Sequence, residues 1–194
     1  MAFIGKVPTP VPLTSADITD GIISTAKISN NAVSVAKLTS TLDLSSNTVT
    51  LPSGVGGKVL QVVTATDDTV RTTTSTSFVS GSLSVNITPS SSSNKVFVMT
   101  SGTCYYDGTN KRYRVTIYRD STNLDGDGSN GLIQGFTSGG NIVGSMNMNI
   151  LDTPSTSSQI TYAVYFRADD TGGNTAYLGE YNVRKSITAF EISG

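Results

Sequence analysis

Branched apolar residues recur every five residues through the first quarter of the chain. When residues 11–40 are written in rows of ten, Leu, Ile or Val fills the third and eighth positions and Ala the sixth. The branched positions are Leu13, Ile18, Ile23, Ile28, Val33 and Leu38. A spacing of five drifts around an α-helix and changes sides along a strand, so neither element fits throughout. The turn residues Asp20-Gly21 and Asn30-Asn31 predict short extended or single-turn pieces separated by bends.

This repeat is not expected to order as an isolated chain. Burial of its branched side chains stabilises by far less free energy than the backbone ordering of about thirty residues costs. We therefore predict that residues 13–50 form a stalk in which identical chains wind together, each contributing the same apolar stripe. A disordered Ser/Thr-rich linker is the alternative, and the regular apolar register argues against it.

The pattern changes after a glycine-rich hinge at 51–57. Short runs of alternating or β-branched residues follow, separated by clusters of Gly, Asn, Asp, Ser and Pro that are typical of turns. The expected strands are 59–63, 69–74, 83–87, 96–99, 113–118, 142–151, 160–166 and 186–192. Many short strands without a helix of useful length predict an all-β chain, in which 58–194 form a jelly-roll-like antiparallel β-sandwich head.

Alternate positions of the expected strands carry the larger apolar side chains, which we assign to the core between two sheets. These residues are Leu83, Val85, Ile87, Val96, Val98, Tyr113, Val115, Ile117, Tyr162, Val164, Phe166, Ile187 and Ile192. We expect them to pack against one another and not to line a binding groove.

The composition removes most catalytic chemistry. The 194 residues include no His, no Trp and one Cys, which excludes His-based acid–base catalysis, His-ligated metals, Ser-His triads and disulfide scaffolds. We therefore expect no enzymatic activity and no cofactor or metal. Charged residues make up 14% of the chain and the net charge is −1, so a polybasic surface for nucleic acid or anionic lipid is not expected. No run approaches the ~20 apolar residues that cross a bilayer, so membrane insertion is not expected.

The first twelve residues follow a different pattern from the repeat. Apolar side chains are interspersed with prolines, which favours extended or polyproline II backbone and leaves its ordering to whatever surface it lies against. We interpret 1–12 as a docking peptide, with a frayed terminus as the alternative. The residues assigned to docking are Phe3, Ile4, Val7, Pro8, Pro10, Val11 and Pro12.

Two acidic motifs imitate functional sites without completing them. The stretch Asn123–Gly128 resembles the front of a calcium loop, but Gln134 stands where a bidentate carboxylate is required. A weak calcium site or an ordinary β-turn remains open there. The adjacent acids Asp67-Asp68 and Asp169-Asp170 lie beside turn residues, so we expect them at solvated loop tips and not in a glycosidase pair.

Aromatic and basic residues are concentrated between 105 and 119. Alternation places Arg112, Arg114, Thr116 and Tyr118 on the sheet face opposite Tyr113, Val115 and Ile117, towards solvent or a neighbouring subunit. The candidate contacts for a glycan or a subunit are Tyr105, Tyr106, Arg112, Arg114 and Tyr118. The alternative is a solvated sheet face without a ligand.

Three sets of segments resemble the repeat-plus-knob fibre proteins of tailed bacteriophages, especially marine and cyanobacterial phages. The first is the decad run 18–28, with its "DGI" and "AKI" elements. The second comprises 57–63, 74–79, 83–90 and 93–99, and the third comprises 152–158, 162–167 and 186–192. Together they span most of 13–194.

The resemblance implies a homotrimeric virion protein, assembled in the host bacterial cytoplasm, that fixes its N-terminus to other virion proteins of the tail or capsid. Its β-rich head would then point outward and contact host-surface glycans. The chain is shorter than most tail fibres, which favours a short capsid-surface fibre or a tail-adjacent appendage. Two alternatives stay open: a capsid decoration protein without a receptor role, and a polysaccharide-depolymerising tailspike, which would need two close carboxylates in the head.

Overall fold

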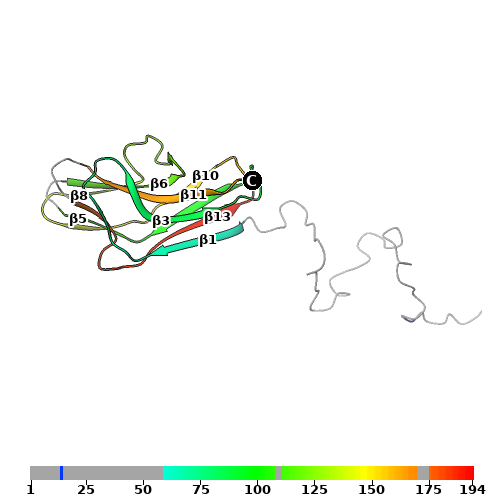
Figure 1. Cartoon of the computed structure of the whole chain (residues 1–194), viewed down its shortest axis with the longest axis horizontal. Helices are drawn as coiled ribbons and strands as arrows, with labels where there is room; N and C mark the ends of the chain where they lie inside the picture. The colour runs from blue at the N-terminus through cyan, green and yellow to red at the C-terminus, as the bar shows by residue number, and fades with distance from the viewer. Residues whose placement is uncertain (1–13, 15–58, 108–110, 170–174) are drawn as a thin grey trace, which may run out of the picture. The chain divides into compact units, whose positions relative to one another are not determined.

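All thirteen elements in the described part of the chain are β-strands. The computed structural model describes residues 14, 59–107, 111–169 and 175–194 (Figure 1). The expected docking peptide (1–12), stalk (13–50, apart from Thr14) and hinge (51–57) lie outside these residues. None of the described segments is a helix with the length and apolarity that a membrane crossing requires.

Alternating β-branched and aromatic residues form the strands, and turn clusters separate them. The strands are β1 (Val59–Asp67), β2 (Arg71–Thr73), β3 (Val79–Ile87), β4 (Lys95–Ser101), β5 (Thr103–Asp107), β6 (Lys111–Arg119), β7 (Thr122–Asn123), β8 (Ile133–Thr137), β9 (Ile142–Ser145), β10 (Asn149–Asp152), β11 (Ile160–Ala168), β12 (Thr175–Leu178) and β13 (Lys185–Ile192). Every expected strand is present. The expected single strand 142–151 is wrong in one respect, because the segment 146–148 divides it into β9 and β10.

One layer of the head consists of two four-stranded half-sheets that meet end to end. The order β1-β13-β4-β10 in one half is repeated by β2-β12-β5-β9 in the other, and each strand of one half is the neighbour in sequence of its counterpart. Gly102 alone joins β4 to β5, with a φ of 157°. The two half-sheets are therefore one layer, interrupted along a line of short connections that we call the bend.

The second layer has the order β3-β11-β6-β7, and β8 also pairs with β6. Each strand of the bent layer is divided in two, so β1/β2, β4/β5, β9/β10 and β12/β13 each count as one strand, and β7 and β8 together count as one. Numbered along the chain in this way, the strands lie in the order 1-8-3-6 in the bent layer and 2-7-4-5 in the other layer. All pairings are antiparallel. This order of eight antiparallel strands in two sheets is that of a jelly roll, so the predicted fold class is confirmed.

The chain enters and leaves the head at the same end. Val59 at the start of β1 pairs with Ile192 at the end of β13 (Figure 1). We call this end proximal. The opposite, distal end carries the β2–β3 connection (74–78) and the β8–β9 connection (138–141).

Alternate residues of both layers point inward and form one core. Twelve of the thirteen expected core residues are buried there. The exception is Ile192, for which the prediction is wrong: positions 185, 187, 189 and 191 of β13 face inward, so position 192 falls on the outer face. The core also contains Cys104, Tyr106, Met146, Met148 and Leu178.

Candidate ligand-binding surface

The candidate contact residues of β5 face opposite sides of the bent layer. Tyr105 points outward and is half-buried, whereas Tyr106 is completely buried in the core. The expectation of a surface position is therefore wrong for Tyr106, because adjacent residues of a strand alternate between faces.

The alternation expected along β6 is confirmed, since Tyr113, Val115 and Ile117 lie in the core. On the opposite face, Arg112 is exposed and its guanidinium lies 5.4 Å from the ring centroid of Phe136. Arg114, however, is buried, so the expectation that it faces solvent or a partner is wrong. Its side chain lies beneath the loop that follows β7.

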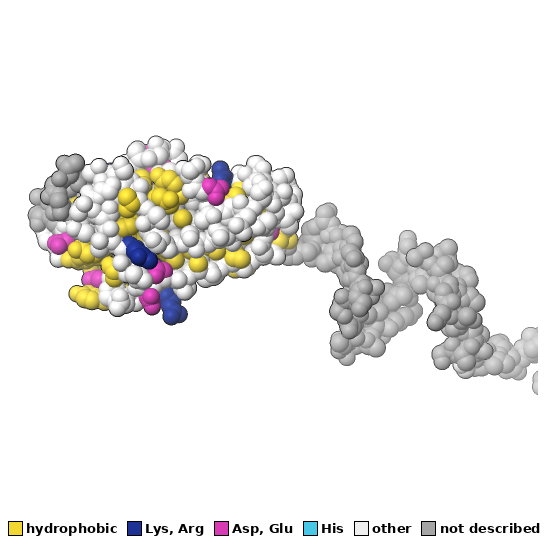
Figure 2. All heavy atoms as spheres, in the orientation of Figure 1, with side chains coloured by type: hydrophobic (Ala, Val, Ile, Leu, Met, Phe, Trp, Pro, Cys, Tyr) yellow, Lys and Arg dark blue, Asp and Glu magenta, His cyan; other side chains and the backbone are white. Residues whose placement is uncertain are grey.

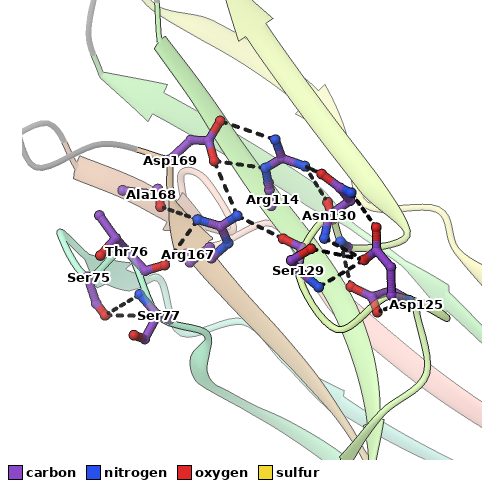
Figure 3. A network of polar contacts seen from close by, with 12 residues as sticks. Ser75, Thr76, Ser77, Arg114, Asp125, Ser129, Asn130, Arg167, Ala168 and Asp169 are labelled. Carbon is purple, nitrogen blue, oxygen red and sulfur yellow. Dashed lines mark hydrogen bonds and ion pairs between the residues drawn. The ribbon is translucent and has the colours of Figure 1, made fainter.

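A polar network explains why Arg114 is covered (Figure 3). Its guanidinium forms an ion pair with Asp169, with Nε 2.9 Å from Oδ1, and donates to the carbonyl and side-chain oxygens of Asn130. Arg167 also reaches Asp169, at 3.2 Å, and donates to the carbonyls of Thr76 and Ser129. The two arginines thus hold the loop 124–131 against the outer face of the second layer.

The acidic residues of this loop bind its own backbone. Asp125 accepts hydrogen bonds from the amides of Gly128 and Gly131, and Asp127 accepts them from the amides of Ser129 and Asn130. The amides of Asn130 and Ser129 lower the pKa of Asp127 to about 2. The carboxylates that resemble a calcium motif therefore close a turn. No group of three or more Asp, Glu, Cys or His side chains suited to a metal ion occurs among the described residues.

Tyr118 lies in an aromatic cluster over the second layer. Its ring stacks on Tyr165 with centroids 4.1 Å apart and meets the edge of Phe78 at 6.2 Å. An open cavity of about 430 Å³ lies beside Phe78, Tyr118 and Arg167. The guanidinium of Arg167 already binds Asp169 and the carbonyls of Thr76, Ser129 and Ala168, and it lies 5.2 Å from the ring centroid of Phe78. Because the rings also contact one another, the polar and aromatic groups here largely serve the fold.

A second open cavity, of about 380 Å³, lies on the outer face of the bent layer in its distal half. We call it the tyrosine cavity; its lining is Val70, Tyr105, Asn141, Tyr177, Gly179, Glu180 and Tyr181. Tyr105 and Tyr177 face each other across paired positions of β5 and β12, with ring centroids 4.9 Å apart and an edge-on arrangement. The amide of Asn141 donates to the hydroxyl of Tyr105. Tyr181 is 89% exposed.

The tyrosine cavity offers ring faces, hydroxyls, an amide and one carboxylate, and none of its lining residues is Lys or Arg. Partial desolvation, Asp107, and other neighbours including Glu180 raise the pKa of Tyr105. Like any tyrosine hydroxyl, that of Tyr105 is protonated at neutral pH and can donate a hydrogen bond. Aromatic faces with a few polar groups suit an uncharged ligand that is apolar on one side and hydroxylated at its rim.

The sequence indicates only one residue of this cavity. Tyr105 stands in the aromatic concentration, but Tyr177 and Tyr181 are more than seventy residues away in the chain and reach it because β12 pairs with β5. The unexpected strand β12 and the three residues that follow it therefore supply four of the seven lining residues. The pairing of β12 with β5 has no local sequence signal.

Among solved structures, the chain is similar to proteins of infectious bursal disease virus. It matches the structure of the Gx strain with 15% identity and a TM-score of 0.38 over 74% of this chain and 37% of that one. It matches the VP2 subviral particle with 12% identity and a TM-score of 0.35 over 75% and 42% of the two chains. The chain thus spans about two fifths of the length of these proteins. No family model and no curated protein matches it.

Proposed function

We propose that the protein is a homotrimeric bacteriophage fibre protein whose jelly-roll head binds a glycan of the host surface in the tyrosine cavity. The observation that carries the receptor role is the position of this cavity. It lies in the distal half of the bent layer, whereas Val59, where the preceding 58 residues join the head, lies at the proximal end. A head tethered at Val59 leaves Tyr105 and Tyr177 free to meet another surface.

The chemistry of the cavity supports a carbohydrate. Sugar rings present C–H faces that pack on aromatic rings, and their hydroxyls need both donors and acceptors at the rim. Tyr177 and Tyr181 supply ring surface, while the hydroxyl of Tyr105, the amide of Asn141 and the carboxylate of Glu180 supply the hydrogen bonds. The cavity volume falls in the usual range for small-molecule sites, about 300–1,000 Å³.

The remaining parts of the proposal concern the chain before Val59. Residues 13–50 form the trimeric stalk, and 1–12 dock on other proteins of the tail or capsid. The glycan is bound and not cleaved, because the acids considered for a glycosidase pair have protein partners. Asp67 forms an ion pair with Lys185, and Asp169 forms ion pairs with Arg114 and Arg167. A decoration role without a receptor is the second candidate, and it is favoured if the tyrosine cavity proves dispensable.

Competition for host cells tests the receptor role. Purified full-length protein should inhibit adsorption of the phage, and Tyr177→Ala should weaken the inhibition at least tenfold because it removes ring surface from the cavity. Tyr165→Ala is the matched control, since it removes a half-buried tyrosine from the other layer. Failure of the wild-type protein to compete, or equal competition by Tyr177→Ala, would overturn the receptor role and leave decoration.

The trimer has its own test. Light scattering on the full-length protein should give three times the chain mass of 20.2 kDa. A mass of one chain would overturn the stalk.

A further inference from the structure

The outer face of the proximal half-sheet carries a row of apolar side chains across all four strands. Val62 of β1 pairs with Phe190 of β13, Phe190 pairs with Phe97 of β4, and Phe97 pairs with Leu151 of β10. Val62 is 52% and Leu151 is 54% exposed. We call this row, together with Leu60 and Met99, the apolar face.

In the second layer, the edge strand β3 carries no such row of apolar side chains. The outward positions of β3 are Ser80, Ser82, Ser84 and Asn86, as expected for a sheet face in contact with water. On the side of the head seen in Figure 2, hydrophobic side chains appear as small groups between atoms of other kinds. The apolar face therefore differs from the outer face of β3.

Its composition is that of the centre of a protein interface. Among the outward positions of β1, β13, β4 and β10, only Lys95 is charged. Aromatic residues and Met are enriched at interface cores, and charged residues are depleted there. An uncharged face can meet an identical one without repulsion between like charges, which favours a second copy of this chain over a charged partner.

The size of the face narrows the kind of partner further. Four strands about 4.8 Å apart and up to nine residues long present roughly 500 Å², below the ~800 Å² per partner of a standard interface. Such an area alone is too small for a stable dimer of free heads. It suits copies that are already held together, because a tether raises the effective concentration of the second contact. In the proposed fibre the tether is the chain before Val59, which joins the head on the strand that carries Leu60 and Val62.

We infer that the apolar faces of the three copies in one fibre meet around their common axis, so that each face packs against those of its two neighbours. This inference takes one element from the proposed function, namely that the chain before Val59 holds the copies together. It does not involve the tyrosine cavity. The proximal half of each bent layer then faces the common axis, and the second layer faces solvent.

Cysteine labelling of the full-length protein tests the contact. Native Cys104 is completely buried, so a maleimide should report only an introduced cysteine. Leu151→Cys should label at least tenfold more slowly than Ser84→Cys, which lies on the outer face of β3. Met99→Cys is a second probe of the same face and should also label slowly. Adding Val62→Asp to Leu151→Cys should restore fast labelling, because a carboxylate would be desolvated in the contact.

Light scattering on the same samples separates this inference from the proposed function. A trimer in which Leu151→Cys and Met99→Cys label as fast as Ser84→Cys overturns the head contact and leaves the stalk intact. A monomer with fast labelling overturns both. Slow labelling that is relieved by Val62→Asp in a protein that remains trimeric supports a contact made by the heads and held by the tether.

Discussion

The Nζ atom of Lys185 lies 3.6 Å from Oδ2 of Asp67, at directly paired positions of β13 and β1. The lysine side chain is completely buried and donates a 2.8 Å hydrogen bond to the carbonyl of Thr69. It fills the bend: a Cβ added at Gly102 or Gly179 would come within 2.9 Å of its side chain. The lysine therefore occupies the space that the interrupted strands leave, and Asp67 provides its counter-charge.

Removing this lysine should destabilise the head strongly. Lys185→Met leaves Asp67 without its partner, and loss of one member of a buried pair costs about 3–5 kcal/mol. Because Asp67 is partly exposed, we expect the lower end of this range, measured by urea unfolding followed by circular dichroism. Replacing both residues, in Asp67→Leu/Lys185→Met, should recover most of the loss. The exposed Lys95→Met is the control, and an equal loss there would contradict the assignment.

Glu191 should make the proximal end sensitive to acid. Its buried carboxylate accepts hydrogen bonds of 2.6–2.7 Å from Gln61, Asn94 and both the amide and hydroxyl of Ser90. Burial opposes ionisation, but these donors hold the pKa of Glu191 at about 2, below its ordinary value of 4.5. Between these values the unfolded state binds more protons, so this stabilisation is complete above pH 4.5 and is lost as the pH falls towards 2.

Thermal unfolding at several pH values measures this effect. Glu191→Gln should lower the stability at pH 7 by at most about 3 kcal/mol and flatten the fall in melting temperature between pH 4.5 and 2. Asp68→Asn, at an exposed position, should leave both the stability and its acid dependence nearly unchanged. If the melting temperature of Glu191→Gln falls with pH in parallel with that of the wild type, carboxylates other than Glu191 determine the acid sensitivity.

The alternation of apolar residues predicts the jelly roll because each strand has one buried face. It does not predict the bend, which depends on Gly102 and on a buried lysine that looks like a surface residue in the sequence. The same limit applies to the sites. Tyr105 is correctly placed at the surface, but Arg114 is covered by a loop whose carboxylates close turns, and a covering loop has no signature in strand periodicity. The local pattern of residues likewise does not predict which strands pair, and so does not predict that Tyr177 lies beside Tyr105.

The loop 124–131 should loosen when its anchor is removed. Asp169 is the shared partner of Arg114 and Arg167, and Asp169→Ala leaves Arg114, which is buried, without a counter-charge. We expect a loss of about 2–3 kcal/mol and at least tenfold faster hydrogen exchange of amides in 124–131. Mass spectrometry of the loop peptide measures the exchange, with Asp68→Ala as the control. Unchanged exchange in Asp169→Ala would mean that Asp125 and Asp127 hold the loop without the arginines.

The ring of Tyr113 lies against two glycines of different layers, Gly135 of β8 and Gly144 of β9. A Cβ at Gly144 would overlap the Tyr113 hydroxyl, with Cζ at 3.3 Å, whereas one at Gly135 would overlap ring carbons. Each glycine-to-alanine change should therefore cost about 1–3 kcal/mol by overpacking. Tyr113→Phe removes only the hydroxyl, so it should relieve most of the cost of Gly144→Ala and little of that of Gly135→Ala. Double-mutant cycles from urea unfolding measure both couplings, and equal couplings would contradict this packing of Tyr113 between the layers.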